Sequence, residues 1–241
     1  MLTYAELQKR PKKLLALSGL ARREFDELLP VFTQALAEAE AHARPQRKKR
    51  QRAPGGGRKP GLGAVADTLR VLFILVYTKT YPLQVVQGEM FGMSQSSANE
   101  WLHRLLPVLR ETLARLGVLP ERDGAQAARQ ARRRGEPADL IVDGVERRRQ
   151  RPKDAKIQAI HYSGKKKAHS DKNVIVVNTG SQRVSYLSPT LPGSVHDKAL
   201  ADYADIQYPQ HATLRSDSGF IGYAPSVRQH LQPKKNPRST R

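Results

Sequence analysis

The chain has 241 residues, with 42 Lys and Arg against 22 Asp and Glu, and its formal net charge at neutral pH is +20. It contains no cysteine, which excludes a disulfide scaffold, a cysteine nucleophile and thiolate metal sites. The longest apolar run, 71–77, is far shorter than the ~20 residues that span a bilayer, and the N-terminus lacks the apolar stretch of a secretory signal. We therefore expect a soluble, cytoplasmic protein with no membrane partner, whose excess charge is neutralised by a nucleic acid.

The first segment, 1–43, has the pattern of an amphipathic helix. Phe25, Leu28 and Phe32 recur at helical spacing. Ser18 has the right chemistry to cap this helix, which we expect to run to about residue 43.

Residues 44–61 are basic and contain three consecutive glycines but no acidic residue. Repulsion between like charges and the freedom of the glycine backbone predict a flexible linker. Such a segment is either a solvated spacer or a tether that lies on phosphate. Its candidate DNA-binding residues are Arg47, Lys48, Lys49 and Arg50.

Residues 62–119 show the layout of a helix-turn-helix domain. A helix over 62–79 ends before Pro82, and a short helix, the turn Gly92–Ser94 and a second helix follow. Pro107 lies inside the last helix and is expected to kink or divide it. The alternative is an ordinary helical hairpin capped by Ser94. Small polar residues suited to base edges and phosphates open the second helix: Ser94, Gln95, Ser96, Ser97 and Asn99.

The hydrophobic pattern changes after a second basic connector, 120–137. Short β-rich or alternating runs follow, together with a helix over 194–203, which Ser194 and Asp197 could start as a capping box, and a further helix over 225–231. The chain thus divides into a helical N-terminal part and an α/β C-terminal part. The predicted strands are 138–143, 156–161, 173–178, 183–187 and 213–217.

Two carboxylates stand at the ends of predicted strands, Asp143 and Asp217. Converging carboxylates can bind Mg²⁺ or Mn²⁺, and a pair of such ions supports phosphodiester chemistry. The alternative is that each aspartate is a turn or cap residue.

Four blocks in the C-terminal part, taken in order, resemble one family. They are the strand end 141–146 (IVDGVE), the segment 161–169 (HYSGKKKAH), the segment 191–198 (LPGSVHDK) and the segment 216–222 (SDSGFIG). Together they resemble the DDE transposases of bacterial insertion sequences, of the insertion-sequence-five type with a Harbinger-like nuclease domain. Val145 and Phe220 depart from the family, where threonine and tyrosine are common. The segment 62–110 also resembles the helix-turn-helix of this group.

The resemblance implies an α+β protein, in which a helical region with a helix-turn-helix precedes an incomplete RNase-H-like α/β nuclease domain, 138–241. It also implies two Mg²⁺ ions held by three acidic residues, with Asp143 and Asp217 as the first two. The third is normally a glutamate farther downstream, but this sequence has no Asp or Glu after Asp217. We therefore expect a truncated or frameshifted chain that is inactive alone, or one that a second reading frame completes.

Other residues in these blocks are open to two interpretations. Asp197 is a candidate additional acid, although its position also suits a helix cap. Next to it, His196 either contacts DNA or packs against the protein. Glu146 is expected to pair with the arginines at 147–149. The run Lys165, Lys166, Lys167 and His169 is either a solvated hairpin tip or a set of contacts to the DNA backbone, which the resemblance favours.

The leading hypothesis is a transposase that binds inverted-repeat DNA ends and catalyses Mg²⁺-dependent strand cleavage and transfer at the bacterial nucleoid. Its partner is double-stranded DNA, at transposon ends and at the target, and a homodimer is left open. The alternatives are a non-catalytic DNA-binding protein or regulator of transposition, and an RNA-binding protein. The sequence lacks the aromatic run that base stacking on RNA requires, since 6% of its residues are aromatic.

Overall fold

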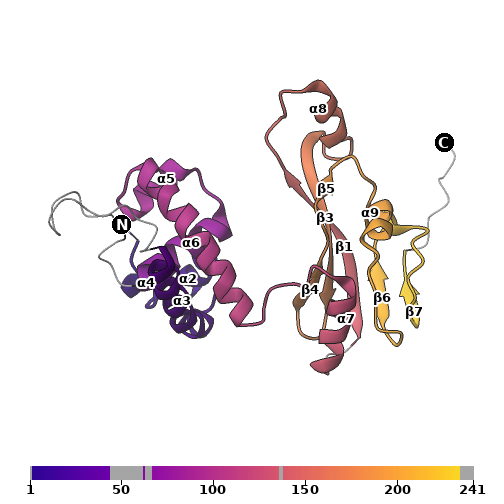
Figure 1. Cartoon of the computed structure of the whole chain (residues 1–241), viewed down its shortest axis with the longest axis horizontal. Helices are drawn as coiled ribbons and strands as arrows, with labels where there is room; N and C mark the ends of the chain where they lie inside the picture. Colours follow the sequence, from indigo (N-terminus) through magenta and orange to yellow (C-terminus); the bar gives the residue numbers. More distant parts are fainter. Residues whose placement is uncertain (1, 44–61, 63–66, 136–137, 234–241) are drawn as a thin grey trace. The chain divides into compact units, whose positions relative to one another are not determined.

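The computed structural model describes residues 2–43, 62, 67–135 and 138–233, and its residues divide into two compact units, Met1–Val118 and Leu119–Arg241. The first unit is helical (Figure 1). The candidate DNA-binding residues Arg47, Lys48, Lys49 and Arg50 lie outside the described residues. The helices of the first unit are α1 (Tyr4–Leu7), α2 (Pro11–Ser18), α3 (Arg22–Ala43), α4 (Asp67–Thr80), α5 (Gln84–Phe91) and α6 (Gln95–Arg115).

Helix α4 supplies much of the apolar core of the first unit, because its residues from Val71 to Val76 are all buried. Phe25 and Phe32 of α3 and Phe91 of α5 belong to the same core. At the surface, Arg104 and Arg115 of α6 bind glutamates of α3, with Nη2–Oε distances of 2.6 Å. The segments before and after 44–61 therefore belong to one packed unit.

One sequence expectation for this unit is wrong, and of the two expected effects of Pro107 one is excluded. Ser18 does not cap α3, because it is the last residue of α2 and its hydroxyl donates to the Leu14 carbonyl at 2.7 Å. Instead, the Glu24 carboxylate accepts the Ala21 N–H at the start of α3. Pro107 does not divide the second helix, since α6 continues through it.

The second unit is a mixed sheet with helices (Figure 1). Helix α7 (Gly124–Arg133) lies in the segment expected to be a connector. The other helices are α8 (Ala155–His161), α9 (Asp197–Ala204) and the 3-10 turn η1 (Ser218–Phe220). The strands are β1 (Asp139–Arg148), β2 (Tyr162–Ser163), β3 (Ala168–Asn178), β4 (Arg183–Leu187), β5 (Leu191–Pro192), β6 (Thr213–Ser216) and β7 (Gln229–Leu231).

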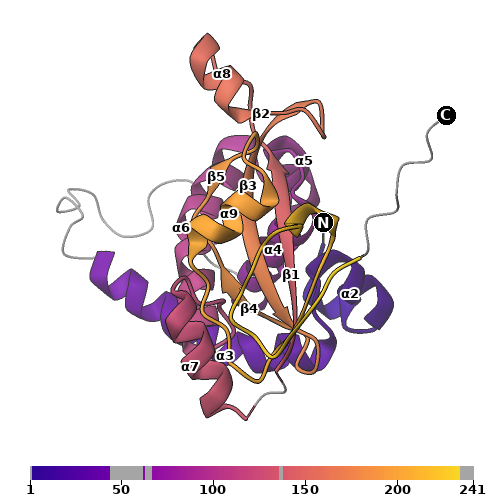
Figure 2. The same ribbon diagram turned by 90° about the vertical axis from the view of Figure 1, so that its right-hand side faces the viewer.

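The strand order is β2-β3-β1-β6-β7, and β4 and β5 also pair with β3. Strand β1 runs antiparallel to β3 and parallel to β6, while β6 runs parallel to β7. Figure 2 shows α9 across the face of the sheet, where Leu200 and Ala201 join the core formed by Val142 and Val176. The α+β class is confirmed.

Three expectations fail in this unit. The predicted strand 156–161 is helix α8, because Asp154 caps it by accepting the Ile157 N–H at 3.0 Å. The predicted helix 225–231 contains strand β7. The capping box is absent, since the Ser194 hydroxyl donates to the Ile160 carbonyl and His196 occupies the N-cap position of α9. In the described residues we find no helix with the length and apolarity that a membrane span requires.

Candidate functional site

Helices α5 and α6 are joined by a tight turn that depends on two glycines. Gly92 has a φ of +67°, a conformation that glycine adopts without strain. Gly88 lies so close to the turn that a Cβ there would be 2.5 Å from the Met93 carbonyl oxygen. The local sequence therefore fixes the approach of the two helices.

The beginning of α6 presents several of the predicted DNA-binding residues. Ser94 caps the helix by accepting the Ser97 N–H, and the Ser97 hydroxyl contacts Ser94 at 3.0 Å. Gln95 and Ser96 are exposed. Asn99 donates to the Gln84 side chain at 3.1 Å and so links α6 to α5. Gln95 and Ser96 are therefore the best placed of the set to reach a base edge.

The two aspartates at the predicted strand ends lie on neighbouring parallel strands. The β1–β6 register pairs Val142 with Ser216, so Asp143 and Asp217 each come one residue after this pair. Asp143 lies within β1 rather than at its end. Both side chains are exposed, and each accepts a local backbone N–H, from Gly144 at 2.7 Å and from Gly219 at 2.8 Å.

A cleft of about 400 Å³ contains Asp217 and Asp197. The walls of the cleft also carry Lys165, Lys172 and His196, but Asp143 does not line it. His196 is exposed there, which leaves its side chain free to meet a ligand. The structure thus brings Asp197 together with Asp217, beside the strand that carries Asp143.

Asp197 is held by a lysine that the sequence did not single out. The Lys172 ammonium donates to Asp197 Oδ1 at 3.2 Å and to the Val195 carbonyl at 3.0 Å. The two side chains are 9% and 16% exposed, so the ion pair is largely shielded from water. Lys172 lies in the polar first half of β3, between Asp171 and Asn173, so the local sequence gives no signal that its side chain is buried.

Two glycines bring the backbone against the Asp197 carboxylate. A Cβ on Gly144 would lie 2.8 Å from Oδ1, and a Cβ on Gly219 would lie 2.9 Å from Oδ2. The same point at Gly219 is 3.0 Å from Asp217 Oδ1, so the Asp197 and Asp217 carboxylates lie close together. Carboxylate oxygens are the donors that Mg²⁺ and Mn²⁺ prefer. Among the described residues, however, no group of three or more His, Asp or Glu side chains is arranged to hold a metal ion.

Comparison with protein families finds one match in the helical unit and one in the unit with the sheet. Residues 142–240 match the DDE superfamily endonuclease, and residues 70–115 match the helix-turn-helix of DDE superfamily endonuclease. The chain carries these two domains of the DDE endonuclease superfamily. No curated protein and no solved structure matches it.

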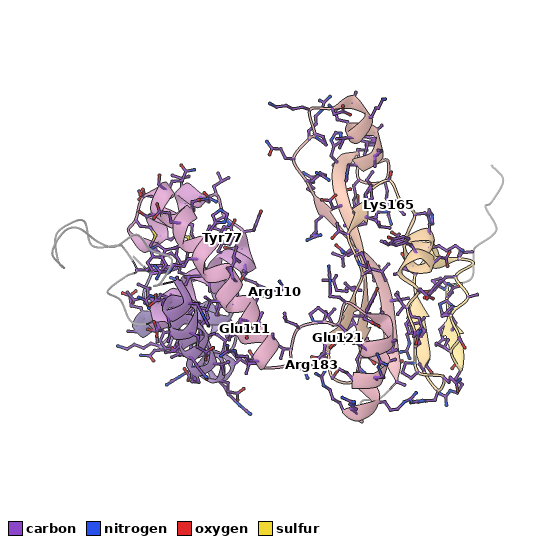
Figure 3. The ribbon with its side chains drawn as sticks, in the orientation of Figure 1. Tyr77, Arg110, Glu111, Glu121, Lys165 and Arg183 are labelled. Carbon is purple, nitrogen blue, oxygen red and sulfur yellow. The ribbon has the colours of Figure 1, made fainter. Side chains whose placement is uncertain are left out.

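In the endonuclease domain, the Lys165–Lys167 run forms the turn between β2 and β3, and all three lysines are exposed. Lys165, labelled in Figure 3, also lines the cleft. The His169 ring lies 5.6 Å from the Tyr162 ring, edge to face. One end of the cleft is therefore strongly positive.

Glu146 does not pair with the neighbouring arginines of the endonuclease domain. Its carboxylate accepts the Ser170 hydroxyl, whereas Arg147 donates to Asn173 and Arg149 to Asp171. Burial raises the pKa of Glu146, but hydrogen bonds from Ser170 and Ser163 and the charges of nearby lysines outweigh burial and leave that pKa below its usual value. The expectation failed because these side chains find partners across the sheet, on β3, rather than among their neighbours in sequence.

Proposed function

We propose that this protein is a transposase of a bacterial insertion sequence. Its helix-turn-helix domain binds the inverted-repeat ends of the element, and its endonuclease domain cuts these ends and transfers them to target DNA. The observation that carries the proposal is the cleft, where Asp197 and Asp217 lie beside β1 and its Asp143, with Lys165 at the rim.

In this proposal Asp143 and Asp217 hold divalent metal, with Asp197 as an additional acid. Their oxygens suit Mg²⁺ or Mn²⁺, which when bound activates a water or hydroxyl and stabilises the leaving oxygen. Lys165 and its neighbours hold the DNA backbone next to the acids, and Lys172 holds the Asp197 carboxylate in place.

A second candidate is a non-catalytic DNA-binding protein that regulates transposition by occupying the element ends. It is favoured because, among the described residues, no group of three acids is arranged for metal. Both candidates predict binding to the same DNA, so only metal binding and cleavage separate them.

The test uses the full chain and a labelled duplex with the terminal inverted repeats that flank its coding sequence. We expect tight binding that weakens in the Gln95→Ala variant, and weak Mn²⁺ binding that is lost in Asp217→Asn. With Mg²⁺ we expect nicking of the repeat ends that is lost in Asp143→Asn and in Asp217→Asn.

The outcomes are distinct. Nicking that survives in Asp143→Asn and Asp217→Asn would overturn catalysis by these acids. Binding to the repeats without any Mn²⁺ binding would leave the regulator as the function. Preferential binding to structured RNA over duplex DNA would overturn both candidates.

A further inference from the structure

Helix α8 is an exposed arm at one end of the endonuclease domain. None of its residues is buried, and Figures 1 and 2 both show it at an extremity of the sheet. Nevertheless, Ile157 and Ile160 are 44% and 51% exposed, and Tyr162, which follows the helix, is 45% exposed. Folding of this domain therefore leaves an apolar and aromatic group uncovered on a short helix.

The base of the arm is fixed firmly to the sheet. Arg149 Nη1 donates to Asp171 Oδ1 at 3.0 Å, and His161 Nδ1 lies 3.0 Å from the same oxygen. At the end of the helix, the Ile160 carbonyl accepts the hydroxyl of Ser194, a residue that lines the cleft. The arm thus stands at the mouth of the cleft that contains Asp197 and Asp217.

The charge around the arm indicates what covers it. The segment 147–169 contains nine Lys and Arg residues and one acid, Asp154, which is occupied in capping α8. A second copy of the chain would bring the same positive charge to this surface, which opposes self-association. A nucleic acid supplies the opposite charge, and its bases supply flat apolar surfaces.

Tyr162 has the geometry of a stacking platform. Its ring is braced edge to face by His169, with 5.6 Å between centroids, while almost half of the residue stays exposed. Apolar side chains that enter a base step unstack it, and aromatic rings stabilise bases that have left the duplex.

We propose that α8 and Tyr162 form a base-contacting arm, in which Ile157, Ile160 and Tyr162 pack against bases unstacked from the duplex at the mouth of the cleft. This inference rests on the proposed function and adds how the DNA is opened beside the acids. It assigns to the arm a preference for distorted DNA, separate from the phosphate contacts of the lysine turn.

The experiment measures the affinity of the full chain, by fluorescence anisotropy, for a fully paired duplex and for the same duplex with a short central mismatch. We expect the mismatched duplex to bind about tenfold more tightly, the size of one stacking contact. Tyr162→Ala and Ile160→Ser should each remove most of this preference. Tyr203→Ala is the matched control, because Tyr203 is 67% exposed on α9, outside the arm.

A variant in which Lys166 and Lys167 are both replaced by Gln separates the two kinds of contact. It should weaken binding to both duplexes equally and leave their ratio unchanged. The proposed role of the arm would be overturned if the wild type bound the two duplexes equally, or if Tyr162→Ala left the ratio of the two affinities unchanged. Either result would leave the proposed function intact. Failure to bind either duplex would instead overturn the proposed function. A dimer that dissociates on Ile157→Ser substitution, with no change in DNA binding, would make the arm a self-association surface.

Discussion

At the scale of single residues, Asp197 connects the two segments that carry the predicted metal ligands. Its carboxylate lies against Gly144, next to Asp143, and against Gly219, whose N–H binds Asp217. Adding a Cβ atom at either glycine should therefore change the distances between these aspartates.

Gly144→Ala tests this close contact. The new Cβ would lie 2.8 Å from Asp197 Oδ1, so the carboxylate or the strand must move, and we expect the free energy of unfolding to fall by about 1–3 kcal/mol. Urea denaturation measures the change. Gly164→Ala is the control, since no neighbouring heavy atom lies within 4 Å of its Cβ position, and equal stability losses in the two variants would contradict the close contact.

Glu146 gives the endonuclease domain a pH dependence of known sign. Its pKa in the folded protein lies below the usual 4.5, so its stabilising contribution is present above that pH and is lost as the pH falls through the lowered pKa. Glu146→Gln should therefore lose less stability than the wild type as the pH falls from neutral through this lowered pKa. Urea denaturation at several pH values measures this, with the exposed Glu100→Gln as the control. If Glu146→Gln left the pH dependence of the unfolding free energy unchanged, Glu146 would not be its source.

How far the sequence predicts the site differs from one residue to the next. Asp143 and Asp217 are predicted because each follows apolar residues of a strand, and in the structure they follow paired residues of neighbouring strands, although only Asp217 lines the cleft. The partner of Asp197 cannot be found in this way, because Lys172 is 25 residues away in sequence and reaches it only across the folded sheet.

At the scale of elements, the predictions are accurate where the signal acts on residues close to it in sequence. The helix-turn-helix is predicted well, since Pro82, Gly92 and Ser94 act on residues within one turn of themselves. Helix α8 is misread as a strand because its polar and apolar residues alternate by chance, and because it packs against no core that would impose helical spacing. The decisive signal was Asp154, which acts as a cap.

Ser94→Ala and Ser96→Ala separate folding from recognition in α6. Loss of the Ser94 cap should reduce the free energy of unfolding by about 1 kcal/mol, because the Ser97 N–H loses its acceptor. Ser96 is exposed, so its replacement should leave stability unchanged and weaken binding to the inverted repeats. Thermal denaturation and anisotropy titration measure the two effects. Equal stability of the two variants would show that the cap contributes nothing.

At the scale of the whole molecule, the net charge of +20 should make DNA binding strongly dependent on salt. The logarithm of the association constant should fall linearly with the logarithm of the salt concentration. Replacing Lys165, Lys166 and Lys167 together by Gln should reduce the slope by up to about three, at roughly 0.9 for each lost phosphate contact. Titrations over a range of salt concentrations measure the slope, and an unchanged slope would remove the lysine turn from the DNA interface.

The β1–β6 pairing also determines when the endonuclease domain can form. Val142 and Ser216 are partners although 74 residues separate them (216 − 142), so a long loop must close before the parallel pair gains any hydrogen bond. The antiparallel β1–β3 ladder pairs residues much closer in sequence, Leu140 with Asn178 and Arg148 with Ser170. During synthesis, β1 and β3 leave the ribosome well before β6. The growing polypeptide therefore passes through a stage at which the β1 edge that will receive β6 is a bare row of amides and carbonyls, open to pairing with another chain.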